Sequence, residues 1–307
     1  MRVVVAGLGV QGHKRRTIAG ADCVATVDPI NPEADHPTLD AVPVDSYDAV
    51  LACVPDSPKT TLIGACIRNR KHILVEKPLW AEDENALAHL ENQARAADVM
   101  VYTAYNHRFE PHFEAMKKLI DSNRLGRLYR CRMFYGNGTA RQVRESAWRD
   151  QGGGVLPDLG SHLLDTARFW FGSVSEDIRL VSVDRFENRA PDHVVLTTST
   201  GEPRLELEMS LLSWRNHFTC DLFGENGSAH IESLCKWGPT SFVVRDRVLP
   251  SGRPPEETRI LVQTDPTWDL EYTHFKKLCS DGRRTDLSGD RWLQKTLNRL
   301  EREIPTS

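Results

Sequence analysis

The feature that most constrains the fold lies at the start of the chain, where a short β-branched run leads directly into three glycines. The run Arg2–Ala6 is followed by Gly7-Leu8-Gly9-Val10-Gln11-Gly12 and then by a stretch compatible with a helix. Glycines at this spacing allow a tight turn, a close approach of the backbone to a ligand, and close packing of the helix on the strand. Free N–H groups at the start of that helix can bind phosphate. The pattern therefore predicts a strand–turn–helix unit that binds the pyrophosphate of a dinucleotide, with a purely structural turn as the alternative.

The remainder of the first 120 residues alternates short apolar strands with helices. Further strands are predicted at 23–27, 49–54, 72–75 and 99–103, and a helix with one apolar face at 82–97. This alternation is typical of parallel βαβ units whose sheet is covered on both faces. The segment 29–43 is rich in Pro and Asp, so we expect a loop where a helix would otherwise stand.

The pattern changes after residue 120, where strands follow one another with turns between them. We expect a dinucleotide-binding α/β domain over residues 1–120 and an α+β domain with a largely antiparallel sheet over residues 121–307. A helix at about 156–170 interrupts the strands, and a last helical stretch lies at 270–278. The strands of the second domain are predicted at 128–135, 178–185, 193–199, 204–212, 217–223, 228–232 and 241–248.

Composition and charge argue against several classes of protein. The net charge of −4 provides no basic excess for nucleic-acid binding. The apolar N-terminal run Val3–Val10 contains two glycines and is too short for a membrane span. The charged segment Gly12–Arg16 that follows it is no small-residue cleavage site, which argues against a secretory signal. The seven cysteines are scattered without C-x-x-C spacing, which disfavours a disulfide framework and structural zinc. We therefore expect a cytoplasmic protein with no nucleic acid, no membrane and no metal among its partners.

The residue at the end of the second strand bears on the choice of cofactor. Asp28 lies 21 positions after Gly7. A carboxylate at this place can accept hydrogen bonds from an adenosine ribose and repels a 2′-phosphate, which favours NAD over NADP. A turn cap before Pro29 is the alternative use of Asp28. Arg15 and Arg16, which we expect to face solvent on the first helix, keep NADP open.

Two further groups carry side chains suited to chemistry. Lys77, in the sequence Glu76-Lys77-Pro78, follows a buried strand at the edge of the sheet where open parallel sheets bind ligands. Asp158 and His162 are four residues apart on the helix that follows three glycines, hence on one face. A carboxylate beside an imidazole can orient it as a general base. Taken singly, these residues would also fit a surface lysine and a structural Asp–His pair.

Together these motifs resemble the Gfo/Idh/MocA family of NAD(P)-dependent oxidoreductases, named for glucose–fructose oxidoreductase and inositol dehydrogenase. The resemblance implies a Rossmann domain followed by a domain with a large open, mostly antiparallel mixed sheet. It spans nearly the whole chain and rests on a series of motifs in order. These are the glycine loop 7–12, the strand end 49–55, Glu76–Leu79, Asn106–Pro111, Leu125–Arg127, Gly152–His162 with Asp165, and the region from Phe275 with Gly282-Arg283.

The resemblance also implies roles for individual residues. Lys77 is expected to contact the substrate, and Asp158 and His162 to act as acid and base. The implied substrate site comprises Lys77, Arg108, Trp148, Asp158 and His162. The implied cofactor site comprises Gly7, Leu8, Gly9, Val10, Gln11, Gly12, Asp28, Val54, Pro55, Glu76, Lys77 and Asn106. Two departures stand out: Lys59 occupies a position where the family often carries His, and the unit around 29–43 is short.

The implied reaction is hydride transfer between nicotinamide and a carbinol carbon of a sugar, cyclitol or nucleotide-linked sugar. One alternative is a reductase of a non-sugar carbonyl or unsaturated bond, as in the biliverdin reductase branch. Another is a non-catalytic NAD-binding protein of the same fold. A broad sheet with one face uncovered by helices would expose apolar surface. We therefore expect a homodimer or homotetramer joined through the C-terminal sheets.

Overall fold

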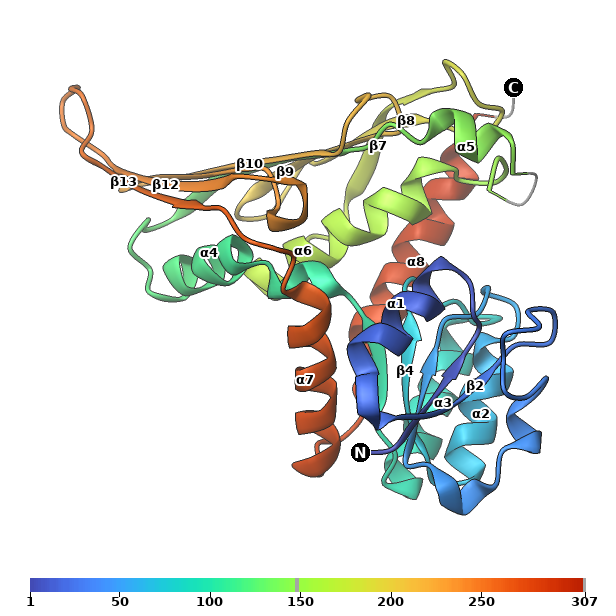
Figure 1. Cartoon of the computed structure of the whole chain (residues 1–307). Helices are drawn as coiled ribbons and strands as arrows, with labels where there is room; N and C mark the ends of the chain where they lie inside the picture. Colours follow the sequence, from blue (N-terminus) through green and yellow to red (C-terminus); the bar gives the residue numbers. More distant parts are fainter. Residues whose placement is uncertain (147–148, 306–307) are drawn as a thin grey trace. The chain divides into compact units, whose positions relative to one another are not determined.

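The computed structural model describes residues 1–146 and 149–305. The chain forms two compact units, and each draws on more than one stretch of sequence. The nucleotide unit comprises residues 1–106 and 267–295, and the sheet unit comprises residues 107–266 and 296–307. The domain boundary expected from the sequence lies at residue 120. The chain passes from the first compact unit to the second at residue 106 and returns to the first at residue 267 (Figure 1).

The nucleotide unit is built on a five-stranded parallel sheet in the order β2-β1-β3-β4-β5. Every neighbouring pair in it is parallel. The central strands are continuously apolar and buried, as expected when helices cover both faces of a sheet. The five strands predicted from the sequence are confirmed. They are β1 (Val3–Ala6), β2 (Cys23–Val27), β3 (Ala49–Ala52), β4 (His72–Glu76) and β5 (Val101–Ala104).

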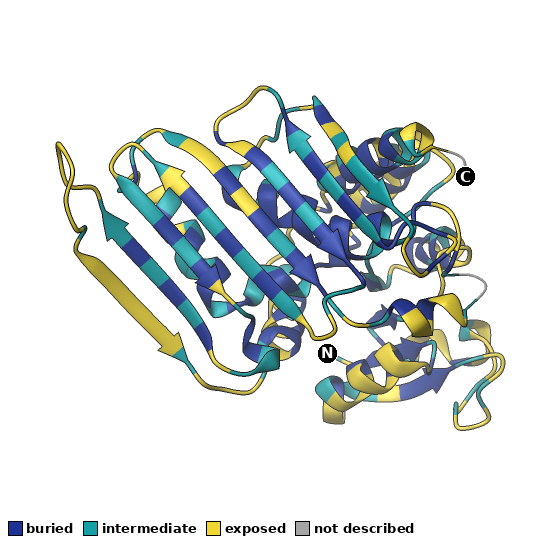
Figure 2. Ribbon diagram, turned by 90° about the horizontal axis from the view of Figure 1, so that it is seen from above, coloured by how far each residue is buried: buried dark blue, intermediate teal, exposed yellow. Residues whose placement is uncertain are grey.

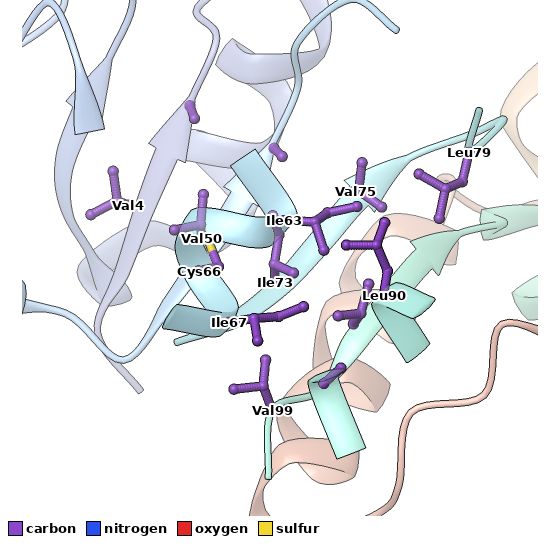
Figure 3. Close-up of a cluster of buried hydrophobic side chains, with 14 of the residues drawn as sticks. Val4, Val50, Ile63, Cys66, Ile67, Ile73, Val75, Leu79, Leu90 and Val99 are labelled. Atoms are coloured by element: carbon purple, nitrogen blue, oxygen red, sulfur yellow. The ribbon is translucent and has the colours of Figure 1, made fainter. Parts of the chain in front are cut away.

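Helices cover both faces of this sheet. On one face, Val50, Ile73 and Val75 pack with Ile63 of α2 and Leu87 of α3 in the cluster that Figure 3 shows. On the other face, the alternate strand residues pack with Ala19 of α1 and with Tyr272 and Phe275 of α7. The predicted helices at 82–97 and 270–278 correspond to α3 and α7. The bounds are α1 (Val10–Ala19), α2 (Lys59–Arg68), α3 (Glu84–Ala97) and α7 (Thr267–Ser280).

The segment between β2 and β3 forms a loop, as its Pro-rich sequence predicted. It contains only two short 3₁₀ turns, Leu39–Ala41 and Val44–Ser46. Its first part runs along the edge of β2, where Asp35 accepts hydrogen bonds from the backbone and hydroxyl of Thr26 at 2.8 and 2.7 Å. The loop thereby covers a strand edge that a helix would not have reached.

The sheet unit contains eight strands in the order β13-β12-β11-β10-β6-β9-β8-β7. Only the central pair, β6 and β9, is parallel, which confirms the mostly antiparallel mixed sheet. The strand β13 was not predicted, because its side chains are almost all exposed and its sequence lacks alternation. The strands are β6 (Leu128–Gly136), β7 (Ile178–Asp184), β8 (His193–Thr198), β9 (Arg204–Ser210), β10 (His217–Gly224), β11 (Gly227–Glu232), β12 (Thr240–Asp246) and β13 (Glu256–Leu261).

Helices cover the inner face of this sheet. The predicted helix at 156–170 is a π-helical turn, Leu156–Gly160, that continues into α6 (Ser161–Phe171). Trp170 of α6 donates a hydrogen bond from Nε1 to the carbonyl of Phe113 at 3.0 Å, and Phe113 packs on Phe218 of β10. The helices α4 (Pro111–Asp121), α5 (Ala140–Arg144) and α8 (Ser288–Glu303) were not predicted, and α8 contributes residues to both units.

The outer face of the sheet is more polar than we expected. Figure 2 shows buried and accessible residues alternating along the strands. On neighbouring β6 and β9 these outward residues are charged and pair diagonally, with Arg130 3.7 Å from Glu206 and Arg132 3.6 Å from Glu208. The expectation of an apolar outer surface is therefore wrong for these central strands, because alternation places arginine and glutamate outward.

Among the described residues, no helix combines the length and apolar character that crossing a bilayer requires.

Candidate active site

The glycine loop joins β1 to α1 through backbone contacts that exclude side chains. Gly7 has φ +90°, and a Cβ on it would lie 2.4 Å from the carbonyl oxygen of Cys53. A Cβ on Gly12 would lie 1.8 Å from the carbonyl oxygen of Gly7. A Cβ on Gly9, in contrast, would meet no described atom within 4 Å, and no described side chain caps the start of α1. The loop thus presents open space and helix N–H groups, which is the geometry that binds phosphate.

Asp28 lies beside this loop and is held by three backbone hydrogen bonds. Its Oδ2 accepts from Leu8 at 2.8 Å, and its Oδ1 accepts from Ile30 and Asn31 at 2.8 and 2.9 Å. These backbone donors, that of Leu8 foremost, lower the pKa of the Asp28 carboxyl. Asp28 therefore caps the turn that follows β2, which was the alternative role expected for it from the sequence. A carboxylate has about four acceptor positions, so Oδ2 keeps one for a ligand.

Arg15 of α1 is buried, which corrects the expectation that it faces solvent. Its side chain is 1% exposed and bonds Glu76 at 2.8 Å and Glu271 at 2.6 Å. The ring of Trp268 lies 4.3 Å from its guanidinium carbon. Burial opposes a charge on Arg15, but the two carboxylates outweigh it and raise the pKa. Arg16, in contrast, is exposed as expected. The side chain of Glu76, expected in the cofactor site, is thus engaged with Arg15.

Lys59 is a second buried cation beside the Glu76–Pro78 segment. It is 2% exposed, and its Nζ donates to Asp56 Oδ1 at 2.6 Å and to the carbonyl oxygen of Pro78 at 2.8 Å. Burial lowers the pKa of Lys59, and the nearby charge of Lys77 lowers it further. Sequence reasoning noted Lys59 only as a departure from the family pattern. The structure shows that it anchors the turn next to Lys77.

The expected cofactor residues all follow strand ends on one edge of the parallel sheet. The parallel registers place the carboxyl ends of all five strands at this edge, where ligands bind in such sheets. Asn106 donates from Nδ2 to Thr267 Oγ1 at 2.8 Å, which ties the end of β5 to α7. The edge carries the glycine loop after β1, Asp28 after β2, Val54 and Pro55 after β3, Glu76 and Lys77 at the end of β4, and Asn106 after β5.

His162 lies within an aromatic cluster of the sheet unit. It belongs to α6, is 8% exposed and stacks on His107, with ring centroids 4.0 Å apart. The ring of Tyr135 on β6 lies edge-on to His162 at 5.8 Å. Burial, reinforced by the charges of Asp158 and Glu110, raises the pKa of Tyr135. His107 and Tyr135 were not singled out from the sequence, because ring packing across distant segments leaves no local pattern.

Asp158 lies on the π-helical turn that precedes α6. Its side chain is 39% exposed and its Oδ2 lies 3.3 Å from Nη2 of Arg149, another residue that the sequence did not indicate. π-Helical turns commonly occur at functional sites. Asp158 is thus an accessible carboxylate that forms an ion pair with Arg149, nine residues earlier in the chain.

Arg108, expected near the substrate, forms a bidentate ion pair with the buried Asp165. Its Nε donates to Asp165 Oδ2 at 2.8 Å and its Nη2 donates to Oδ1. This pair joins the 3₁₀ turn Asn106–Phe109 to α6 and gives Asp165 of the motif a structural role. Trp148, also expected near the substrate, lies outside the described residues. Within residues 1–146 and 149–305, no three His, Cys, Asp or Glu side chains gather as a metal site.

Comparison with known proteins identifies the family. Residues 1–105 match the model of the oxidoreductase family with an NAD-binding Rossmann fold, and residues 113–230 match the GFO/IDH/MocA C-terminal domain. Together these matches cover more than half of the chain. The chain belongs to the Gfo/Idh/MocA family.

Individual relatives agree with this assignment. The chain is 28% identical to inositol 2-dehydrogenase of Rhizobium meliloti (strain 1021), over 70% of this chain and 64% of the relative. It is 28% identical to scyllo-inositol 2-dehydrogenase (NADP(+)) IolW of Bacillus subtilis (strain 168), over 75% of this chain and 60% of the relative. Both matches span less than two thirds of the relative's length. The solved structure of levoglucosan dehydrogenase in complex with NADH superposes with a TM-score of 0.80 at 17% identity, covering 100% of both chains.

The buried Arg15 cluster leads to a stability prediction. Replacing Arg15 by Met leaves Glu271, which is fully buried, without its cationic partner. Because an uncompensated buried charge is costly, the free energy of unfolding should fall by about 3–5 kcal/mol in urea titrations. Arg16→Met, on the exposed neighbouring position, should change it by less than about 0.5 kcal/mol. The double variant Arg15→Met/Glu271→Leu should recover much of the loss. Equal stability of Arg15→Met and Arg16→Met would contradict the pairing of Arg15 with Glu271.

Proposed function

We propose that this chain is an NAD(P)-dependent oxidoreductase that acts on a CH–OH group of a sugar, cyclitol or nucleotide-linked sugar. The observation that carries the proposal is the gathering of the glycine loop, Asp28 and Lys77 at the carboxyl edge of one parallel sheet. Family membership supports it, as do the two relatives named inositol dehydrogenases. In such a reaction the substrate carbon gives up a hydride and its hydroxyl gives up a proton.

The residues present suit a dinucleotide. The open side of Gly9 and the uncapped start of α1 would hold the pyrophosphate. The remaining acceptor position on Asp28 would bind the adenosine ribose, and its charge favours NAD over NADP. Val54, Pro55 and Asn106 follow neighbouring strands at the same edge. The bound nicotinamide would supply the hydride acceptor.

The proton chemistry is assigned to His162, Lys77 and Asp158. His162 is the proposed base, because an imidazole accepts and returns protons near neutral pH. Lys77 would hold the reacting oxygen and stabilise its developing negative charge. Asp158, accessible and close to the start of α6, would bind a neighbouring hydroxyl of the polyol or orient the base. Arg108 would act through Asp165 by fixing the 3₁₀ turn against α6.

We also propose that the protein works in the cytoplasm. All seven cysteines are free in the structure, in agreement with a reducing compartment.

The cofactor proposal is tested by calorimetric titration with NAD and NADP. The unmodified protein should bind NAD more tightly, because Asp28 repels the 2′-phosphate of NADP. Asp28→Ser should narrow the difference. Asp28→Asn removes the charge and keeps one of the two acceptor oxygens, so it should narrow the difference as well. Equal or tighter binding of NADP by the unmodified protein would remove Asp28 from the ribose site.

The proposed reaction is tested by screening sugars, cyclitols and nucleotide-linked sugars for formation of NADH. With the substrate so identified, His162→Ala should lower turnover by about 10²–10⁴-fold while NAD binding is retained, because a general base contributes that much. Lys77→Ala should lower turnover and raise KM. The exposed positions His89 and Lys118 provide the control variants His89→Ala and Lys118→Ala. Normal turnover of His162→Ala would show that the base is misassigned and make Lys77 the candidate.

The assembly proposal is a homodimer or homotetramer joined through the outer faces of the eight-stranded sheets. Such contacts would have to use the charged rows of β6 and β9, so the assembly should weaken as salt screens them. Light scattering at micromolar concentration should give a multiple of 34.7 kDa. The double variant Arg130→Glu/Arg132→Glu should dissociate the oligomer. A monomer mass at low salt overturns the proposal.

A further inference from the structure

The stacked rings of His107 and His162 bring two titratable groups from distant parts of the chain into contact. His107 lies on the 3₁₀ turn Asn106–Phe109, and His162 lies near the start of α6. Their centroids are 4.0 Å apart and their planes differ by 21°. This is a face-to-face contact, in which neither ring offers its edge to the other.

The surrounding aromatic rings hold both imidazoles in place. His107 is 2% exposed and His162 is 8% exposed. Tyr135 lies edge-on to both, with centroids at 5.2 and 5.8 Å, and Phe113 lies edge-on to His107 at 6.1 Å. Trp237 stacks on the far side of this group, on Tyr135. Turning either imidazole would therefore displace a packed ring.

Charged groups border the pair on several elements. The Arg108–Asp165 pair joins the turn of His107 to the helix of His162. Asp158, with Arg149, precedes α6. Glu110 follows the 3₁₀ turn, and burial raises its pKa. The hydroxyl of Tyr135 on β6 belongs to the same cluster, and the ammonium of Lys236 lies over the Trp237 ring that stacks on Tyr135.

Protonation of both stacked imidazoles costs more free energy than protonation of one. A positive charge on one imidazole disfavours a charge on the other, and the penalty is greater away from water. Groups that interact this strongly lose their protons in two steps that belong to the pair.

We propose that His107 is a positioning residue for His162, and that the two rings form a stacked pair that holds a single proton. The inference rests on the role proposed above for His162 as base. His107 fixes the plane of the His162 ring. In the reacting pair both rings are neutral, and His162 accepts the substrate's hydroxyl proton as the hydride leaves for nicotinamide. The pair then carries that one proton until it passes to solvent.

The direct test is an NMR titration that needs no substrate. In the full chain labelled with ¹⁵N-histidine, the ring nitrogens of His107 and His162 are followed from pH 5 to 9. Each signal should change in two steps at least about one pH unit apart. His107→Phe, which keeps an aromatic ring at the stack, should leave His162 with one step. His112→Phe is the matched control, since His112 is buried and stacks on Phe242 instead. It should leave both steps in place.

The second readout is the pH dependence of turnover. His107→Ala should lower the maximal rate at least about tenfold, and His107→Phe should restore most of that loss while shifting the pH profile by about one unit. If the two histidines titrate in two steps but the protein forms no NADH with any substrate screened, the pair is supported and only the proposed reaction is refuted. A His162 signal that changes in one step, or that does not change between pH 5 and 9, overturns the pair whatever the activity.

Discussion

A buried arginine ties together the elements at the carboxyl edge of the parallel sheet. Arg15 on the helix after the glycine loop bonds Glu76 at the end of β4 and Glu271 on α7, a segment more than 250 residues away. Glu271 is fully buried, so neither it nor Arg15 can lose its partner without leaving a charge away from water. This cluster sets where Lys77 leaves the sheet and requires residues 267–295 to return to the nucleotide unit.

Lys59 complements this cluster from the other side of the same turn. Its ammonium binds the carbonyl oxygen of Pro78, while Glu76 is bound by Arg15. The residues on both sides of Lys77 are thus fixed by buried cations. Glu76 and Arg108, which the sequence suggested as ligand contacts, have their charged groups engaged in ion pairs within the protein.

Much of the fold could be predicted because its signals are local. A β-branched run followed by Gly7, Gly9 and Gly12 leaves few alternatives, since side chains at Gly7 and Gly12 would collide with backbone atoms. The Pro-rich segment 29–43 correctly indicated a loop. Strand β13, which buries almost nothing, carried no alternation and was missed. Helices α4 and α8 were missed although each has one apolar face, so their local signal was present in the sequence. The expectation of an apolar outer face was wrong, because it followed from the lack of covering helices and did not weigh Arg130, Arg132, Glu206 and Glu208 as outward residues.

Short-range spacing was enough to predict the parallel sheet, the glycine loop, the positions of Asp28 and Lys77 at strand ends and the family. Which charged groups remain accessible depends instead on how distant segments pack. Arg15 and Arg16 are neighbours of identical chemistry, yet one is buried between two carboxylates and the other faces solvent. The stack of His107 on His162 was likewise invisible in the sequence. Burial and ring packing join residues far apart along the chain, and no local spacing records them.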